Sequence, residues 1–451
     1  MKKTEVNMLS GSIFKGLLRM TLPIMVMNVM QTLFSVIDMT VLGNLVDDRA
    51  VGAVGACSML ITMCTSLLIG ISAGANVVVA RHIGARDDKC TEEAVATAFS
   101  FAFAGGIVLM LIGVSCAGIF LRWTNCPESL LPQAVTYFKI YFLGVPVIML
   151  YNFSASILRA AGDTRRPMLF LMLGGVVKVL LNIFCITVLN LTVEGVAIAT
   201  VVSNGIAGGL CFWVLLRMKD KLHFSLRKLR FYPAELKDIL YVGVPTGLQS
   251  AMYSLANVVI TTAVNSFGPD ATTGISIANQ FDGILYHVAC APSLAAIPYI
   301  AQNIGAQNIR RAKQTVVRAI LITVAFGATF GSLSAIFSGQ LSSLMSSTPE
   351  VIRYSQQKMM IISSTYFICG INEVMGGTLR GMGKPIIPTI ATFLFMCVIR
   401  FFWVYLIFPL CPNLTFLYLI WPIGWILSII TLLIAYFPTV AGLEQQRAKV
   451  S

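Results

Sequence analysis

Three carboxylates of this chain lie inside long apolar stretches, where an ionised side chain is costly. They are Asp38, Asp282 and Glu373, and the other sixteen of the 19 Asp and Glu residues fall in loops or tails. An ionised group in the hydrocarbon of a bilayer costs at least about 2.5 kcal/mol on insertion scales, so it must face water or a partner. Such a group can bind and release a proton or another cation, or it can form a structural ion pair.

Asp38 shares one helix face with three other polar residues. The stripe consists of Asn28, Gln31, Ser35 and Asp38. Residues spaced by three or four positions project from the same side of a helix, and the rest of the stretch is mainly Leu, Ile, Val, Met and Phe. We therefore expect this stripe to face an internal cavity. A second, uncharged stripe consists of Gln249, Tyr253, Asn257 and Thr261.

The depth of Asp38 in its apolar stretch predicts which other polar residues lie near it. A helix rises about 1.5 Å per residue, and Asp38 and Asn182 each lie 15 residues after a proline, Pro23 and Pro167. Both side chains therefore reach a similar level, with Lys178 one turn away from Asn182. The expected cluster consists of Asp38, Lys178, Asn182, Thr200 and Asn204. A carboxylate beside a lysine in such a cluster can take part in a proton-coupled cycle.

Further polar residues of the apolar stretches are expected to line the same internal space. With the two stripes, the expected cavity residues are Asn28, Gln31, Ser35, Asn152, Gln249, Tyr253, Asn257, Asp282, His287, Glu373 and Arg400. We expect Arg400 to pair with Glu373 or with Asp282, either as a functional pair or as a purely structural one. For His287, a satisfied interior histidine is the alternative to a proton carrier.

The elements that must position these residues are membrane helices. Of the 451 residues, 57% are hydrophobic and 11% are charged, whereas a soluble domain carries roughly 25% charged residues. Many apolar stretches exceed the roughly 20 residues that cross a bilayer, and strict period-two alternation, typical of a membrane barrel, is absent. The fold class predicted is an all-α polytopic membrane protein. Its twelve predicted spans lie near 16–43, 51–79, 94–118, 133–157, 166–188, 194–216, 238–266, 271–300, 316–338, 356–378, 386–409 and 415–438.

The second half of the chain repeats the first half in the same sense, at a shift of 221 or 222 positions. Pro23 returns as Pro245, and Ile260 takes the place of Asp38. The residues Leu158, Arg159, Gly162 and Pro167 return as Leu379, Arg380, Gly383 and Pro388. Arg400 lies one residue from the repeat position of Lys178. Two sets of six spans in the same sense predict two six-helix bundles related by a pseudo-twofold axis along the membrane normal, as in many transporters.

Basic residues follow the loops in an alternating pattern. The net charge is +13, and 25 of the 32 Lys and Arg residues fall at the termini or at every second loop. The other loops hold Arg49, Arg122, Arg353 and Lys358, with Lys139 near a helix end. The positive-inside rule then places both termini in the cytoplasm, and this distribution argues against a nucleic-acid partner. The predicted domains are an N-terminal lobe at 1–217, a cytoplasmic linker at 218–238, and a C-terminal lobe with a short cytoplasmic tail at 239–451.

Enzyme and metal chemistry have no sequence support. There is no phosphate-binding loop, dinucleotide glycine pattern or nucleophile elbow, and the three histidines lack metal-ligand spacing. The eleven cysteines are scattered singly, which is typical of apolar packing. We expect no enzyme activity, no bound metal and no cofactor other than a coupling ion, H⁺ or Na⁺.

Several short segments resemble the multidrug and toxic compound extrusion (MATE) family. They are VIDMTVLG at 36–43, IGA at 83–85, QNIGA at 302–306, LRAAG at 158–162, LRGMG at 379–383 and GVAIAT at 195–200. The resemblance covers nearly the whole chain. It implies a V-shaped pair of six-helix bundles that exports cationic, often aromatic drugs in exchange for protons or sodium.

The resemblance also implies roles for individual residues. Asp38 matches the aspartate of the family's coupling-ion site, and Thr200 matches a polar position of that site. Two departures favour protons over sodium. Lys178 and Asn182 stand where many members have Asn and Asp, and Tyr253 lies near a position where some members carry a glutamate. A fixed positive charge beside Asp38 competes with sodium.

The leading hypothesis is therefore a secondary antiporter that expels amphipathic organic cations. One alternative is a flippase for lipid-linked precursors in the same superfamily, and another is a channel or receptor. We expect a monomeric, multi-pass protein of the cell membrane, with the lipid bilayer and small organic cations as its partners.

Overall fold

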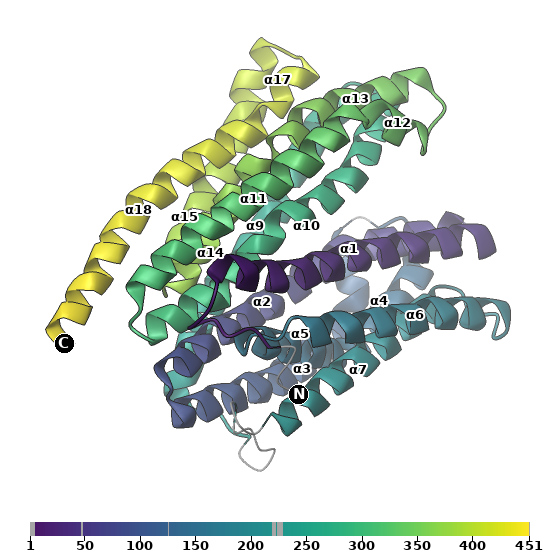
Figure 1. Cartoon of the computed structure of the whole chain (residues 1–451). Coiled ribbons are helices and arrows are strands. Elements are labelled where there is room, and N and C mark those ends of the chain that lie inside the picture. Colours follow the sequence, from purple (N-terminus) through teal and green to yellow (C-terminus); the bar gives the residue numbers. More distant parts are fainter. Residues whose placement is uncertain (1–4, 47, 125, 219–221, 223–228, 451) are drawn as a thin grey trace. The chain divides into compact units, whose positions relative to one another are not determined.

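A computed structural model describes residues 5–46, 48–124, 126–218, 222 and 229–450, and the regular structure of these residues is helical throughout (Figure 1). The helices of the first half are α1 (Ile13–Leu45), α2 (Asp48–Ala85), α3 (Asp88–Trp123), α4 (Leu131–Leu143), α5 (Val145–Ala160), α6 (Arg165–Thr187) and α7 (Val193–Arg217). The next helices are α9 (Pro233–Asn265), α10 (Pro269–Gly305), α11 (Ile309–Ile336), α12 (Ser338–Ser343), α13 (Pro349–Ile362) and α14 (Tyr366–Gly381). After α15 (Ile386–Thr392), α16 (Ile399–Phe402) lies between two π-helical segments, η3 (Phe393–Val398) and η4 (Trp403–Ile407). The last helices are α17 (Leu414–Tyr418) and α18 (Ile420–Val450), and the short 3-10 turns are η2 (Ser363–Thr365) and η5 (Phe408–Leu410).

The twelve predicted spans all fall on helices or on broken helices. Within the described residues, ten helical stretches are long and apolar enough to cross a membrane. The pair α4 and α5, bent by 49° at Gly144, makes an eleventh span if it is taken as one. α9 is also long, with 33 residues, but it is not one of these ten stretches. Its polar stripe makes it less hydrophobic than they are. The all-α class predicted from composition is confirmed.

Packing divides the described chain into two compact units. Unit 1 comprises residues up to Val6 and Val26–Gly247, and unit 2 comprises Asn7–Met25 and Leu248–Ser451. In both α1 and α9 the change of unit comes shortly after the matched prolines, Pro23 and Pro245. The predicted lobes remain a prediction. Within the predicted linker at 218–238, residues 219–221 and 223–228 lie outside the described residues, and the linker's last residues form the start of α9.

Glycines bring α2 and α9 together in unit 1. A Cβ on Gly70 would lie 2.2 Å from the backbone nitrogen of Gly247, and one on Gly74 would lie 2.3 Å from the carbonyl oxygen of Ile239. Both helices carry glycines four residues apart at this contact, the arrangement that lets membrane helices pack backbone against backbone. The first part of α9 is therefore held by α2.

Gly74→Ala is expected to destabilise the protein by about 1–3 kcal/mol, because a methyl group at this contact must push two backbones apart. Gly55 in the same helix is the matched control, since a Cβ there would meet no atom within 4 Å. Gly55→Ala should be neutral or slightly stabilising, because alanine is the better helix former. Thermal unfolding of both variants in detergent measures the difference, and equal melting temperatures would refute the contact.

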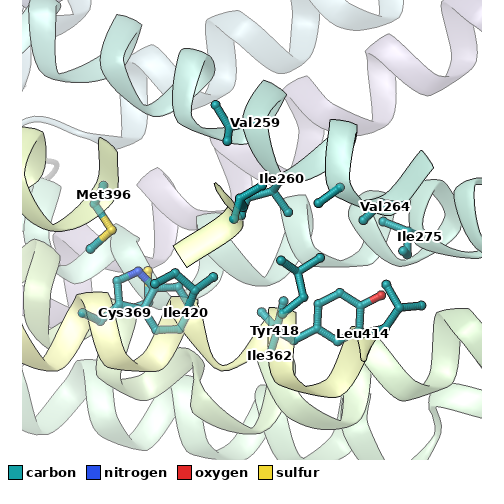
Figure 2. Packing of buried hydrophobic residues seen from close by; sticks show 14 of the residues in the cluster. Val259, Ile260, Val264, Ile275, Ile362, Cys369, Met396, Leu414, Tyr418 and Ile420 are labelled. Atoms are coloured by element: carbon teal, nitrogen blue, oxygen red, sulfur yellow. The ribbon is translucent and has the colours of Figure 1, made fainter. Parts of the chain in front are cut away.

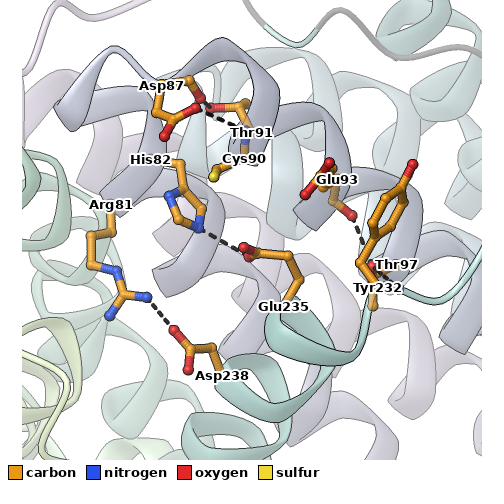
Figure 3. A network of polar contacts seen from close by, with 10 residues as sticks. All are labelled: Arg81, His82, Asp87, Cys90, Thr91, Glu93, Thr97, Tyr232, Glu235 and Asp238. Atoms are coloured by element: carbon orange, nitrogen blue, oxygen red, sulfur yellow. Dashed lines mark hydrogen bonds and ion pairs between the residues drawn. The ribbon is translucent and has the colours of Figure 1, made fainter.

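A polar network also ties the start of α9 to α2 and α3 (Figure 3). Arg81 forms an ion pair with Asp238, and His82 Nε2 lies 3.0 Å from Glu235 Oε2. The Tyr232 backbone NH donates to Thr97 Oγ1 at 3.2 Å. These contacts fix the entry of α9 into unit 1.

The internal repeat reappears as two pairs of similar turns in the backbone. Gly162 and Gly383, each following a helix, have φ values of 93° and 77°, which glycine adopts without strain. Arg86 and Gln307 also share a positive φ, 57° and 58°. After these two residues, Asp87 and Asn308 cap α3 and α11 by accepting hydrogen bonds from backbone NH groups three residues on.

The Asp87 cap predicts an acid-sensitive contribution to stability. The hydrogen bond from the Cys90 backbone NH holds the pKa of the Asp87 carboxyl below its ordinary value. A lowered folded-state pKa means that the contribution is present above the unfolded pKa of about 3.9 and is lost as the pH falls through the folded value. Asp87→Asn keeps a cap, as Asn308 does, and should remove this dependence. Melting temperatures from pH 3 to pH 7 test it; identical pH profiles would contradict it.

In unit 2, α10 packs against α11, α13 and α14. An apolar cluster beside it joins residues of α9, α10 and the C-terminal helices, including Ile260, Ile275 and Tyr418 (Figure 2). The segment before α1 belongs to the same unit, because Arg311 donates hydrogen bonds to the carbonyls of Met8, Ser10 and Gly11. The core of unit 2 thus packs against the helices that carry Asp282, Glu373 and Arg400.

Candidate functional site

The predicted ion pair of unit 1 is present. Lys178 Nζ on α6 lies 2.5 Å from Asp38 Oδ2 on α1, and Asn182 Nδ2 donates to Asp38 Oδ1 at 2.6 Å. All three side chains are buried or nearly so, with Asp38 8% and Asn182 0% exposed. The carboxylate therefore has one partner on each oxygen. Within the described residues, Asn182 Oδ1 has no hydrogen-bond partner.

Small residues of α6 position this ion pair. A Cβ on Gly175 would lie 1.9 Å from the Phe34 ring, and one on Gly174 would lie 2.7 Å from the Ser203 carbonyl oxygen on α7. The two glycines let α1 and α7 approach α6 from different sides. Lys178 follows Gly175 by three residues and Asp38 follows Phe34 by four, so each charged residue lies one turn from this close approach.

Among the described residues, no hydrogen bond joins the other predicted residues of unit 1 to Asp38. Thr200 Oγ1 donates to the Val196 carbonyl and Asn204 Nδ2 donates to the Thr200 carbonyl, both within α7. Asn152 Nδ2 likewise donates to the Ile148 carbonyl of its own helix. Asn28 is half-buried, and Gln31 and Ser35 are exposed. The roles of these six residues stay predictions.

Unit 2 contains a cavity of about 490 Å³. Its lining combines aromatic, amide and charged side chains from α9, α10, α13, α14, α16 and the C-terminal helices. Five predicted residues line it: Tyr253, Asn257, Asp282, His287 and Arg400. Such a mixture of apolar wall and few charged groups is typical of a site for a small organic molecule.

Asp282 pairs with a residue that the sequence interpretation placed in a loop. Lys358 Nζ lies 2.8 Å from Asp282 Oδ2 and also donates to Asn279 Oδ1. Lys358 is only 3% exposed, because α13 begins at Pro349 and carries it two and a half turns into the helix. The span start predicted near 356 hid this position, and a start at the Thr348-Pro349 cap signal would have revealed it.

The predicted pairing of Arg400 with Glu373 or Asp282 is wrong. Glu373 Oε2 lies 3.6 Å from Arg380 Nη2, and Asp282 is taken by Lys358. Arg380, counted with the cytoplasmic loop charges, is 9% exposed in the last turn of α14. Repeat positions suggested these pairs, and a repeat position leaves the direction of each side chain around its helix axis undetermined.

Gln249 and Glu373 are predicted cavity residues that lie beside the cavity but are not among its lining residues. Gln249 donates to Thr392 Oγ1 at 2.8 Å and accepts from Arg380 at 3.3 Å. The Tyr253 hydroxyl donates to Glu373 Oε1 at 3.4 Å. Gln249, Arg380 and Glu373 therefore form a polar layer that reaches the cavity through Tyr253.

Arg400 is the largest fully buried side chain of the described chain, at 1% exposure. Its Nη1 donates to Asn257 Oδ1 at 2.8 Å, and its guanidinium carbon lies 5.0 Å from the centre of the Trp421 ring. Among the described residues, no carboxylate lies within ion-pair distance of it, and its Nε has no hydrogen-bond partner. Asn279, Lys358 and Trp421 are among the lining residues that the sequence interpretation did not place at the cavity.

A family model matches most of the chain. The model of the MatE family matches residues 23–184 and again residues 245–406. This chain belongs to the MATE family. The two matches begin at Pro23 and Pro245, so the duplication inferred from the sequence is the family's own repeat. MATE proteins are transporters, and this member is a multi-pass membrane protein.

Curated relatives and solved structures agree with this assignment. The chain is 28% identical to the "Probable multidrug resistance protein YpnP" of Bacillus subtilis, over 87% of each chain. It is 25% identical to the "FAD transporter" of Shewanella oneidensis, over 85% of each chain. A structure described as "Crystal structure of MATE in the straight conformation" has a TM-score of 0.91 and 20% identity, covering 99% of this chain and 100% of that one. The MATE fold, with twelve helices in two bundles, is confirmed.

Proposed function

We propose that this MATE protein exports small organic compounds across the cell membrane in exchange for protons, with Asp38 as the proton-carrying group. The observation that supports the proposal most is the contact of Asp38 with Lys178 and Asn182. A buried carboxylate held by a single ammonium group changes its contacts when it takes up a proton, since the attraction to Lys178 is then lost. Protonation and local structure are coupled in this way.

The same contact favours protons over sodium. A sodium ion needs several oxygen ligands, and one oxygen of Asp38 is already occupied by the Lys178 ammonium group at 2.5 Å. A second positive charge at this distance would be repelled strongly in a buried site. The proposal places both termini in the cytoplasm, as the distribution of basic residues predicts.

The preference for organic cations stays a prediction with little support from the charges of the site. Asp38, Asp282 and Glu373 each have a basic partner within 4 Å. A paired carboxylate attracts a cationic substrate less than a free one does.

Transport into proteoliposomes under imposed gradients tests the proposal. A dye added to the outer medium should accumulate inside the vesicles when the proton concentration is higher inside than outside. A sodium gradient of the same size and direction should have no effect. Accumulation driven by sodium alone would overturn the choice of coupling ion. Accumulation that needs no gradient would overturn exchange as the mechanism.

A further inference from the structure

Each repeat carries a basic residue in its fifth span, and the two basic residues have different partners. In unit 1, Lys178 has a carboxylate partner in Asp38. In unit 2, Arg400 lies 222 positions after Lys178, although Pro388 lies only 221 positions after Pro167. Pro388 and Arg400 are therefore one position further apart than Pro167 and Lys178.

A π-helical segment accounts for this extra residue. The segment η3 spans Phe393–Val398, directly before Arg400. A π-turn accommodates one more residue than an α-turn, and such segments are common at functional sites. With the extra residue absorbed in η3, Arg400 becomes the structural counterpart of Lys178. Both residues face the first helix of their repeat, Lys178 through Asp38 and Arg400 through Asn257.

The carboxylate of unit 1 has no counterpart in unit 2. Ile260 lies 222 positions after Asp38, and Ile260 lines the same cavity as Arg400. Ile260 is part of the apolar cluster of this unit (Figure 2). The cavity therefore keeps the basic side chain of the repeat but replaces its negatively charged partner with a hydrocarbon.

The remaining charges of the cavity leave Arg400 without neutralisation. Asp282 lies against Lys358, and the contacts of Arg400 are the amide of Asn257, the sulfur of Met396 and the ring of Trp421. A buried cation is stabilised fully only by an anion with matching hydrogen-bond acceptors. The unpaired Nε of Arg400 and its planar fork suit a carboxylate, sulfonate or phosphate oxygen.

The wall around Arg400 is aromatic. Trp421, Trp425, Tyr286 and Tyr366 line the cavity together with His287, and the Tyr366 and Trp425 rings lie 5.8 Å apart. Rings of this kind pack against flat aromatic molecules. A ligand with a planar ring and one anionic group would therefore meet both features of the site.

We propose that the cavity of unit 2 binds aromatic organic anions, with Arg400 binding the anionic group as Lys178 binds the carboxylate of Asp38 in unit 1. This inference names the substrate class of the exporter, so as a statement about transport it rests on the proposed function. As a statement about binding it can be tested in the absence of any gradient.

The test compares two dyes that share a xanthene ring but differ in charge, fluorescein as the anion and rhodamine 123 as the cation. Fluorescence anisotropy titrations of the purified full chain in detergent give the Kd of each dye. Arg400→Gln should weaken fluorescein binding by about tenfold or more, the loss expected when a charge-assisted hydrogen bond is removed. Arg400→Lys should recover only part of it, because lysine lacks the planar fork.

Ile260→Asp is the decisive variant, and Ile260→Asn is its control of similar size and polarity. The new carboxylate reproduces the pair of unit 1, so fluorescein binding should fall about tenfold or more with Asp and much less with Asn. Equal Kd values for these two variants would overturn the inference, as would tighter binding of rhodamine 123 than of fluorescein by the unsubstituted protein.

Transport separates the inference from the proposed function. Charge-dependent fluorescein binding without proton-driven transport of either dye would refute the proposed export and leave the anion site standing. Proton-driven transport of rhodamine 123 with no binding of fluorescein would support the export and refute the anion site.

Discussion

Lys178→Met is expected to lower the free energy of unfolding by about 3–5 kcal/mol at neutral pH, because it leaves Asp38 buried without its ammonium partner. The second change Asp38→Asn should then recover most of this loss. In the double variant an amide replaces the carboxylate and can still accept the hydrogen bond from Asn182. Replacement of a buried ion pair by neutral groups of similar size is often nearly neutral for stability.

Chemical unfolding in detergent of the two single variants and the double variant measures this coupling as a double-mutant cycle. Lys178→Arg is the control, since it keeps the charge while it changes the shape of the side chain. Additive losses in the double variant would mean that Asp38 and Lys178 do not stabilise one another, which would contradict the 2.5 Å contact.

Lys358→Met should also cost about 3–5 kcal/mol, and Asp282→Asn should cost clearly less. The difference follows from the partners that remain. Without Lys358, the Asp282 carboxylate keeps an Oδ1 that has no hydrogen-bond partner in the described chain. Without the Asp282 charge, Lys358 still donates to Asn279 and lies 6.0 Å from the centre of the Trp421 ring.

Melting temperatures of the two variants, compared with that of Lys358→Arg, test this order. The arginine variant should be the mildest of the three, because it preserves a cation beside Asp282. An Asp282→Asn variant less stable than Lys358→Met would show that the carboxylate has other partners than those the structure gives it.

The span positions were predictable because long apolar runs have no other stable location than a bilayer. The contact of Asp38 with Lys178 and Asn182 was predictable for a related reason: matched prolines set the level of each residue, and only a partner at that level can neutralise a buried carboxylate. Thr200 and Asn204 reach the same level but donate to their own helix. Depth is thus a necessary condition for contact and not a sufficient one.

The partners of Arg400 and Asp282 were not predictable from depth. The π-helical segments on both sides of Arg400 rotate the helix face by an amount that no α-helical period reproduces. Lys358 was counted with the loop residues because it stands only two positions after the predicted span start near 356, whereas α13 begins at Pro349, seven residues before that start. The replacement of Asp38 by Ile260 is visible in the sequence, but the partners of the charges in unit 2 needed the structure.

In the proposed mechanism, Asp38 carries the proton that drives export. The direct test uses proteoliposomes with the double variant D38N/K178M, whose fold is expected to be intact, and compares two rates for the same dye. Exchange of labelled for unlabelled dye without any gradient should persist, and accumulation driven by a proton gradient should be lost. Undiminished proton-driven accumulation by this variant would show that the proton is carried elsewhere in the protein.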